Sequence, residues 1–164
     1  MVVWTALILA TVALLAEAAS TDSQTSGITT VGSKKLATAT DCAGVIAFSA
    51  SHGSVKDSKL LLAETLIDKG IGYVAETGIF TTHCPGLYQF SFAGYGDSEL
   101  QLILKRKLNK SEKWNPVANV GSGGGSNLVL LDVDVGDQLS VFVEKGKLID
   151  GGAATFSGYR VSKK

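Results

Sequence analysis

The chain has 164 residues, of which 45% are apolar, and this length is enough for one globular domain with some additional sequence. Its 15 basic residues balance its 15 acidic residues, so no excess charge favours a nucleic-acid stripe or an acidic partner. The balanced charge therefore argues only against a protein that binds its partner mainly through a large excess of one charge. Any further indication of function has to come from the order of the residues.

Residues 1–18 are predicted to be a signal peptide for secretion. An apolar run extends from Val2 to Leu15, and Ala16-Glu17-Ala18 has the small-x-small form of a signal-peptidase site. The alternative is an N-terminal membrane anchor, but the run is shorter than the roughly 20 residues that a spanning helix needs. No Lys or Arg precedes the run, so only the α-amino group supplies positive charge there. We therefore expect a secreted, extracellular protein without membrane insertion.

Residues 19–40 are predicted to be a flexible leader. The segment is rich in Ser and Thr, lacks aromatic residues and has no apolar period. It contains no Gly-X-Y repeat and no sustained heptad, so neither a collagen stalk nor a coiled coil is expected before the domain. Any oligomer must then be held together by the domain itself, residues 41–164.

The domain begins with a strand at residues 44–50, GVIAFSA. Residues 58–68, SKLLLAETLID, form the one candidate helix of the chain. Four side chains recur there with helical spacing: Leu61, Leu62, Thr65 and Leu66. A long loop with one strand fits the same segment nearly as well, so both interpretations stand at this point.

A core strand is predicted within residues 80–92, FTTHCPGLYQFSF. Alternate side chains of a strand point to one face, so Tyr88, Phe90 and Phe92 share a face, and Leu87, Gln89 and Ser91 share the other. The Pro-Gly pair before them is typical of a tight turn. The aromatic face is expected to fill the core.

Further strands follow in the second half of the chain. A long strand is predicted in which Leu100, Leu102, Leu104 and Leu108 alternate with Gln101, Ile103, Lys105 and Lys107. Residues 121–126, GSGGGS, are predicted to be a flexible hairpin connection, because they lack the Lys-Ser/Thr of a phosphate-binding loop.

Two strands are predicted on either side of Gly136-Asp137, and a last strand, ATFSGYRVS, closes the chain. The apolar face before the turn has four members: Val129, Leu131, Val133 and Val135. The face after the turn has three: Leu139, Val141 and Val143. Many short strands with Gly-rich turns indicate an all-β sandwich or barrel, and a jelly roll is the economical choice at this length.

The spacing of several residues resembles the signature of the globular complement C1q domain family. The residues that carry this resemblance are Leu62, Asp68, Tyr73, Phe80, Gly86, Tyr88, Phe90 and Phe92. It continues into the later strands through Gly136, Asp137, Phe156 and Gly158. It covers residues 41–164, and Leu62 departs from it conservatively, since the family usually has Phe there.

The resemblance implies a ten-stranded jelly roll, shared with the tumour-necrosis-factor-like cytokines, that is exported and assembles as a homotrimer. The signature residues are expected to build the fold rather than to contact ligand. Apolar residues on second strand faces, among them Ile103, Tyr159 and Val161, favour self-association, which would bury them. The alternative is that they complete the two-sheet core.

Two features fit a secretory route. Cys42 and Cys84 are the only cysteines, and an intrachain disulfide is favoured over a free thiol pair or a bridge between two chains. Asn109-Lys110-Ser111 is an acceptor sequon for N-glycosylation within a polar stretch that is predicted to be an exposed loop.

No enzymatic motif is found, so the protein is predicted not to be an enzyme. His52 and His83 are the only histidines, and neither has the spacing of a metal-binding motif. No cofactor is expected. Calcium is the open alternative, because some members of the resembled family carry it, although Asp132, Asp134 and Asp137 lack the geometry of an EF-hand.

The favoured function is that of a stalkless, lectin-like recognition protein whose trimer binds a patterned ligand, such as a microbial glycan, in innate immunity. The alternatives are a cerebellin-like or cytokine-like signal that binds a protein receptor, and an extracellular matrix component. The predicted contact residues are Arg106, Lys107, Lys110, Trp114 and Asn115. An exposed Trp among hydrogen-bonding groups can bind a sugar or a protein; the competing interpretation has Trp114 folded onto the sheet.

Overall fold

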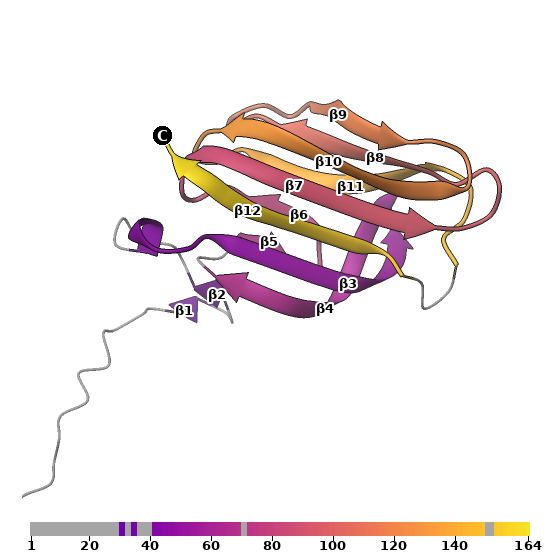
Figure 1. The fold of residues 1–164 in the computed structure, drawn as a ribbon, viewed down its shortest axis with the longest axis horizontal. Coiled ribbons are helices and arrows are strands. Elements are labelled where there is room, and N and C mark those ends of the chain that lie inside the picture. The colour runs from indigo at the N-terminus through magenta and orange to yellow at the C-terminus, as the bar shows by residue number, and fades with distance from the viewer. Residues whose placement is uncertain (1–29, 32–33, 36–40, 70–71, 150–152) are drawn as a thin grey trace, which may run out of the picture.

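Antiparallel strands make up nearly all of the domain in the computed structural model, which describes residues 30–31, 34–35, 41–69, 72–149 and 153–164 (Figure 1). The elements are β1 (Thr30–Val31), β2 (Lys34–Lys35), the short 3-10 helix η1 (Asp41–Ala43), β3 (Ala47–Lys56), β4 (Lys59–Lys69), β5 (Tyr73–Val74), β6 (Ile79–Thr81), β7 (Gly86–Tyr95), β8 (Gln101–Lys107), β9 (Trp114–Val120), β10 (Gly124–Val133), β11 (Gln138–Lys145) and β12 (Thr155–Lys163).

The strands form two packed layers. The first sheet has the order β10-β7-β12-β3-β4, and the second sheet has the order β9-β8-β11-β6-β5. The layers join at one corner, where Lys59 of β4 pairs with Phe142 of β11. Consecutive strands β10 and β11 lie in different sheets, so the chain crosses the sandwich at Gly136 instead of making a hairpin there. This ten-stranded jelly roll confirms the fold expected from the sequence.

Of the two interpretations of residues 58–68, the helix is wrong, because Lys59–Lys69 form strand β4. β4 pairs with β3 from Lys59 back to Lys69, around a two-residue turn whose residues Asp57 and Ser58 both have positive φ. The ladder satisfies the backbone hydrogen bonds that a helix would have satisfied. Leu60 and Leu62 alternate into the core. The helical spacing does not mark a buried stripe, because Thr65 and Leu66 are exposed in β4.

An aromatic cluster fills the space between the sheets. Its members are Phe48, Tyr73, Phe80, Tyr88, Phe90, Phe92 and Phe156, all of them buried. Phe48 stacks on Tyr73 at 5.2 Å between centroids and meets Phe156 edge-on at 5.0 Å. Gly158 lies against this cluster, since an added Cβ would sit 2.6 Å from the ring of Phe48.

Two predictions about the later strands need correction. Gly124–Ser126 belong to β10 and not to a flexible connection, because Gly124 pairs with Tyr95 at positive φ and approaches the backbone of Gly94 too closely for a side chain. The connection between β9 and β10 also passes from one sheet to the other, so it is not a hairpin. Val135 lies in the turn after β10 and is exposed, so it does not share the face of Val133.

The predicted signal peptide, residues 1–18, lies outside the described residues. Of the predicted leader, residues 19–40, the structure describes only Thr30–Val31 and Lys34–Lys35, which pair with each other as β1 and β2. Within the part of the chain that is described, no helix combines the length and the apolar character needed to cross a bilayer.

Candidate binding surfaces

The predicted contact residues come together at one end of the β8–β9 hairpin. Lys107 pairs with Trp114, and Arg106 pairs with Asn115, while residues 108–113 form the loop between the strands. Lys110 is exposed at the tip of this loop with a φ of 64°. The hairpin therefore brings the predicted residues together, but they have different partners and different structural roles.

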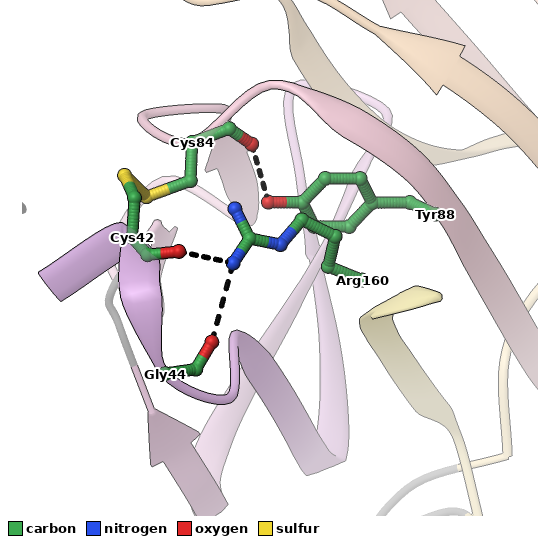
Figure 2. The surroundings of a disulfide bond; sticks show 5 residues. All are labelled: Cys42, Gly44, Cys84, Tyr88 and Arg160. Atoms are coloured by element: carbon green, nitrogen blue, oxygen red, sulfur yellow. Dashed lines mark hydrogen bonds between the residues drawn. A yellow bond between two sulfur atoms is a disulfide. The ribbon is translucent and has the colours of Figure 1, made fainter. Parts of the chain in front are cut away.

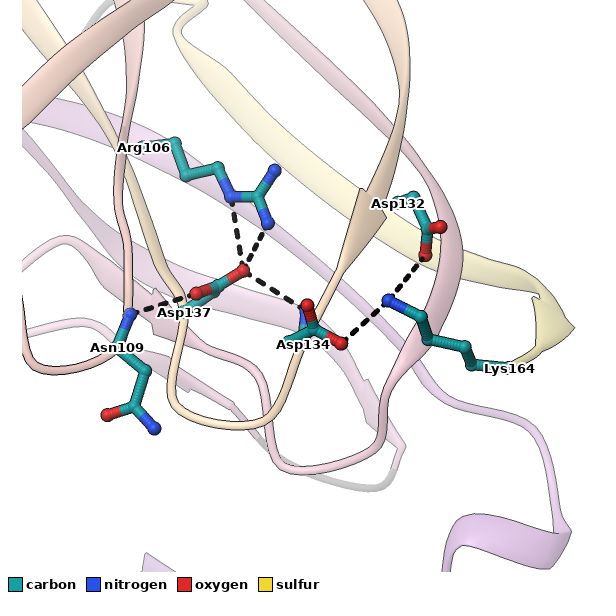
Figure 3. A network of polar contacts seen from close by, with 6 residues as sticks. All are labelled: Arg106, Asn109, Asp132, Asp134, Asp137 and Lys164. Carbon is teal, nitrogen blue, oxygen red and sulfur yellow. Dashed lines mark hydrogen bonds and ion pairs between the residues drawn. The ribbon is translucent and has the colours of Figure 1, made fainter.

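Arg106 is a structural residue. Its guanidinium forms an ion pair with Asp137, whose Oδ2 accepts hydrogen bonds from both Nε and Nη2 (Figure 3). Asp137 also accepts the backbone N–H groups of Asn109 at 2.9 Å and of Asp134 at 3.1 Å. Burial alone would raise the pKa of Asp137, but these hydrogen bonds and the positive charge of Arg106 outweigh burial and hold the pKa below its usual range. Through Asp137, Arg106 thus links the β8–β9 loop to the turn between β10 and β11.

The other two aspartates are held by the last residue of the chain. Lys164 Nζ lies 2.7 Å from Oδ1 of Asp134 and 3.6 Å from Oδ1 of Asp132 (Figure 3). Within the described residues, no group of three or more His, Cys, Asp or Glu side chains is arranged to hold a metal ion. A calcium ion bound by Asp132 and Asp134 would have to displace Lys164.

Trp114 lies on the outer face of the second sheet and packs against Phe142 of β11. The two rings meet edge to face with centroids 5.3 Å apart. Lys105 lies over the ring of Phe142 at 4.6 Å, Lys59 lies 6.0 Å from the same ring, and Lys107 lies 5.7 Å from the ring of Trp114. We name these five residues the lysine–aromatic surface.

Phe142 and two of these lysines were not predicted as contact residues. The strand QLSVFVEK carries the signal that could have found Phe142, because Phe142 has the opposite parity to Leu139, Val141 and Val143 of the core. An aromatic residue with outward parity points to a second packed face. Its neighbours could not be found in the same way, since β4 and β9 reach it only through long-range pairing.

Replacing Trp114 with Ala should lower the free energy of unfolding by about 2 kcal/mol, because a half-buried ring loses its apolar contacts and its edge-to-face pair with Phe142. Trp114→Phe, which keeps an aromatic ring on the same face, should cost less than about 1 kcal/mol. Urea unfolding of both variants measures the difference. An unchanged midpoint for Trp114→Ala would show that the ring does not contribute to the packing of the sheet.

The sequon Asn109-Lys110-Ser111 lies in the exposed loop of the hairpin, as predicted from its polar surroundings. The backbone of Asn109 is fixed by its hydrogen bond to Asp137, and its side chain contacts Gly136. Both Asn109 and Lys110 are exposed. Use of the sequon remains a prediction.

Cys42 and Cys84 form an intrachain disulfide with a Cα–Cα distance of 5.5 Å, so they are neither free nor used between chains (Figure 2). The bond ties η1 to the turn before β7. Arg160 of β12 donates hydrogen bonds to the carbonyl groups of Cys42 and Gly44, and Tyr88 donates one to the carbonyl of Cys84 at 2.6 Å. Burial raises the pKa of Tyr88 to about 12, which keeps this hydroxyl protonated as a donor.

Among the described residues, neither histidine is part of a recognisable catalytic arrangement. His52 of β3 is exposed, with Nδ1 2.6 Å from Oε2 of Glu64. His83 lies in the turn between β6 and β7, and burial lowers its pKa. The hydroxyl of Ser51 lies 3.3 Å from the same Nδ1 of His52 and 3.4 Å from Oε2 of Glu64. The hydroxyl and the carboxylate therefore share one ring nitrogen on an exposed surface, whereas in a catalytic triad they use opposite nitrogens of the ring.

The outer face of the first sheet has small and apolar side chains over its centre and charged side chains at its margins. Lys69 continues the first of the two rows given next, beyond Ala47, and Asp132 and Glu64 lie in the adjoining rows. Two rows of cross-strand neighbours cross it: Leu130, Gln89, Tyr159 and Ala47, and then Leu128, Ser91, Ser157, Ser49 and Ile67. Leu128 is 53% exposed, Leu130 56% and Val45, at the edge, 74%. A shallow hollow of about 470 Å³ lies at the centre, where the side chains are small. Six of the large exposed apolar side chains of the described chain gather on or beside this face: Val45, Ile67, Leu128, Leu130, Tyr159 and Val161.

Comparison with known proteins gives a consistent result. Residues 46–161 match the family model of the C1q domain. The structure is similar to the globular domain of zebrafish complement 1qA protein, with 20% identity, a TM-score of 0.57 and coverage of 73% of this chain and 99% of that chain.

Two further solved structures are similar to this chain. Eiger TNF from S. frugiperda is 15% identical with a TM-score of 0.60, over 73% of this chain and 94% of that chain. Murine APRIL at pH 5.0 is 9% identical with a TM-score of 0.57, over 72% of this chain and 100% of that chain. At these identities the similarity concerns the fold.

Proposed function

The chain belongs to the C1q domain family, and from this membership we propose that it acts as a secreted, homotrimeric recognition module without enzymatic activity. Members of the C1q and tumour-necrosis-factor group form trimers and bind ligands or receptors. The disulfide between Cys42 and Cys84 supports export, because such bonds persist in oxidising compartments. The rest of the proposal depends on one surface.

The observation that carries the proposal is the group of exposed apolar side chains on the outer face of the first sheet. A monomer would expose Leu128, Leu130 and Tyr159 together there, at the cost of contact between apolar side chains and water. Its small central residues leave a shallow hollow into which side chains of a second copy can pack. Cyclic association around a threefold axis would bury this face in every copy and leave no open end.

A charge introduced into this face should convert the trimer into a monomer. Tyr159→Asp places a carboxylate beside Gln89 in the middle of the face, where association would remove it from water. Sedimentation equilibrium of protein secreted by cells that express the full chain should give three times the chain mass for the unchanged protein and one chain mass for the variant.

Val135→Asp is the matched control for this experiment, because Val135 is equally exposed and apolar but lies in the turn after β10, away from the face. It should remain trimeric. A monomeric unchanged protein, or dissociation of both variants, would contradict the proposed interface.

The trimer would present three copies of one weak site, so a repetitive surface would be bound with an affinity well above that of a single site. We propose a patterned glycan of microbial origin as the ligand and innate immunity as the setting. A cytokine-like or cerebellin-like signal would instead bind a protein receptor on cells, and a matrix component would bind neighbouring matrix proteins. Binding to cells that is saturable and survives competition by polysaccharides would favour the receptor over the glycan.

A further inference from the structure

The lysine–aromatic surface holds positive charge in fixed positions on the sheet opposite the proposed trimer face. The ammonium groups of Lys59 and Lys105 lie over Phe142, and that of Lys107 lies over Trp114. Contact with the negative ring faces holds each ammonium near its ring. A long side chain that is already held loses less conformational entropy when it binds a ligand.

The charge of this surface is only partly neutralised. Glu144 forms an ion pair with Lys105, and no carboxylate among the described residues pairs with Lys59 or Lys107. Three ammonium groups thus face one carboxylate, although the whole chain has no net charge. Beyond Lys59 the surface becomes mixed, because the adjoining hollow of about 250 Å³ contains both acidic and basic side chains. The excess of positive charge ends there.

The arrangement of the lysines favours an elongated ligand. Lys107 and Lys105 follow each other on one face of β8, and Lys59 lies across β11, opposite Phe142. The three charges therefore run diagonally over three neighbouring strands. An anionic polymer that crosses the sheet along this line can meet them in succession, with the half-buried Trp114 available to the C–H face of a sugar ring.

Nucleic acid fits this surface less well. Recognition of single strands uses exposed rings on which bases stack. Phe142 is only 9% exposed and its ring is covered by Lys59 and Lys105, so Trp114 is the one ring of this surface that a base could reach, whereas a strand needs a succession of exposed rings. The balanced charge of the chain also lacks the broad basic field typical of nucleic-acid binders.

We infer that the lysine–aromatic surface binds an acidic polysaccharide, through its carboxylate or sulfate groups. This inference rests on the proposed recognition function and names the ligand class and the site. The trimer face would be occupied by other copies, whereas this surface lies on the opposite side of each sandwich and stays accessible. Each trimer would then offer three such lines of charge to one polymer.

The test measures binding of short, single-site probes to the full-length secreted protein, by calorimetry at physiological salt. The probes are a sulfated heparin octasaccharide, a galacturonate octasaccharide, neutral maltooctaose, a single-stranded DNA octamer and anionic phospholipid vesicles. We expect binding to at least one of the two acidic saccharides and none to maltooctaose. The stronger of the two shows whether sulfate or carboxylate is preferred. Higher salt should weaken this binding.

The variants test the position of the site. Lys59→Gln combined with Lys107→Gln should weaken saccharide binding about tenfold, because two charge-assisted contacts are lost. Glu144→Gln should tighten binding about threefold, because it removes the one carboxylate of the surface. Lys147→Gln combined with Lys163→Gln is the matched control, with the same loss of charge at exposed lysines elsewhere, and should stay within about twofold.

Three results would overturn the inference: no binding of either acidic saccharide, equal weakening by both lysine pairs, or an affinity for the DNA octamer or the vesicles as high as for the saccharides. These results are independent of the oligomeric state. A trimer without affinity for acidic saccharides would overturn this inference alone. A monomer that binds them at this surface would overturn the proposed trimer and leave the inference standing.

Discussion

Replacing both cysteines, Cys42→Ser with Cys84→Ser, should lower the free energy of unfolding by about 4 kcal/mol. The bond joins two cysteines that are 42 positions apart in the sequence. Without the bond the unfolded chain regains the conformational entropy of an open loop of that length, which corresponds to about 4 kcal/mol. Urea unfolding of the variant and of the unchanged protein at one fixed protein concentration measures the difference, because an oligomer gains stability with concentration.

The reduced protein provides the control for this experiment. Unfolding in the presence of dithiothreitol should show the same loss for the unchanged protein and no loss for the double variant. The native segment should stay in place without the bond, since Arg160 still donates to the carbonyl groups of Cys42 and Gly44. A loss below about 1 kcal/mol would mean that the unfolded chain is already restricted in this region.

Asp137→Asn should cost about 3 to 5 kcal/mol, as expected for breaking a buried ion pair from one side. Asp137 is 2% exposed and accepts hydrogen bonds from Arg106 and from the backbone of Asn109 and Asp134. An amide in its place brings a donor toward the guanidinium and leaves the positive charge without a partner. The turn between the two sheets and the β8–β9 loop should loosen together, which amide hydrogen exchange would show.

Asp134→Asn is the matched control, because it makes the same chemical change three residues away. Asp134 is exposed and its pair with Lys164 lies on the surface, so its loss should cost less than about 1 kcal/mol. Equal costs for the two variants would contradict a special role for Asp137.

The contribution of Asp137 should also depend on pH. Its pKa in the folded protein is lower than in the unfolded chain, so the unfolded chain binds its proton first as the pH falls. The stability that Asp137 contributes is complete above the unfolded pKa of about 3.9 and is lost as the pH falls through the lower, folded pKa. The difference between the unchanged protein and Asp137→Asn should therefore be constant at neutral pH and shrink in acid, which unfolding curves across that range would measure.

The candidate surfaces show which features of a site could be predicted from the sequence and which could not. The five predicted contact residues were close in the sequence, and a hairpin brought them together as expected. Their roles depended on partners that are distant in the sequence: Arg106 is held by Asp137, 31 positions away, and Trp114 by Phe142. A balanced composition likewise gave no sign of the lysines on one face, because net charge does not record where charges lie.

The sequence by itself determined which side chains of most strands face the core, because alternation is a local property of extended backbone. Tyr88, Phe90 and Phe92 were assigned correctly from their spacing alone. Only the tertiary structure decided which strands are neighbours, that residues 58–68 are a strand, and that β10 and β11 lie in different sheets. Strand pairing is a choice among distant segments, and its free energy comes from burial and hydrogen bonds that exist only once those segments meet.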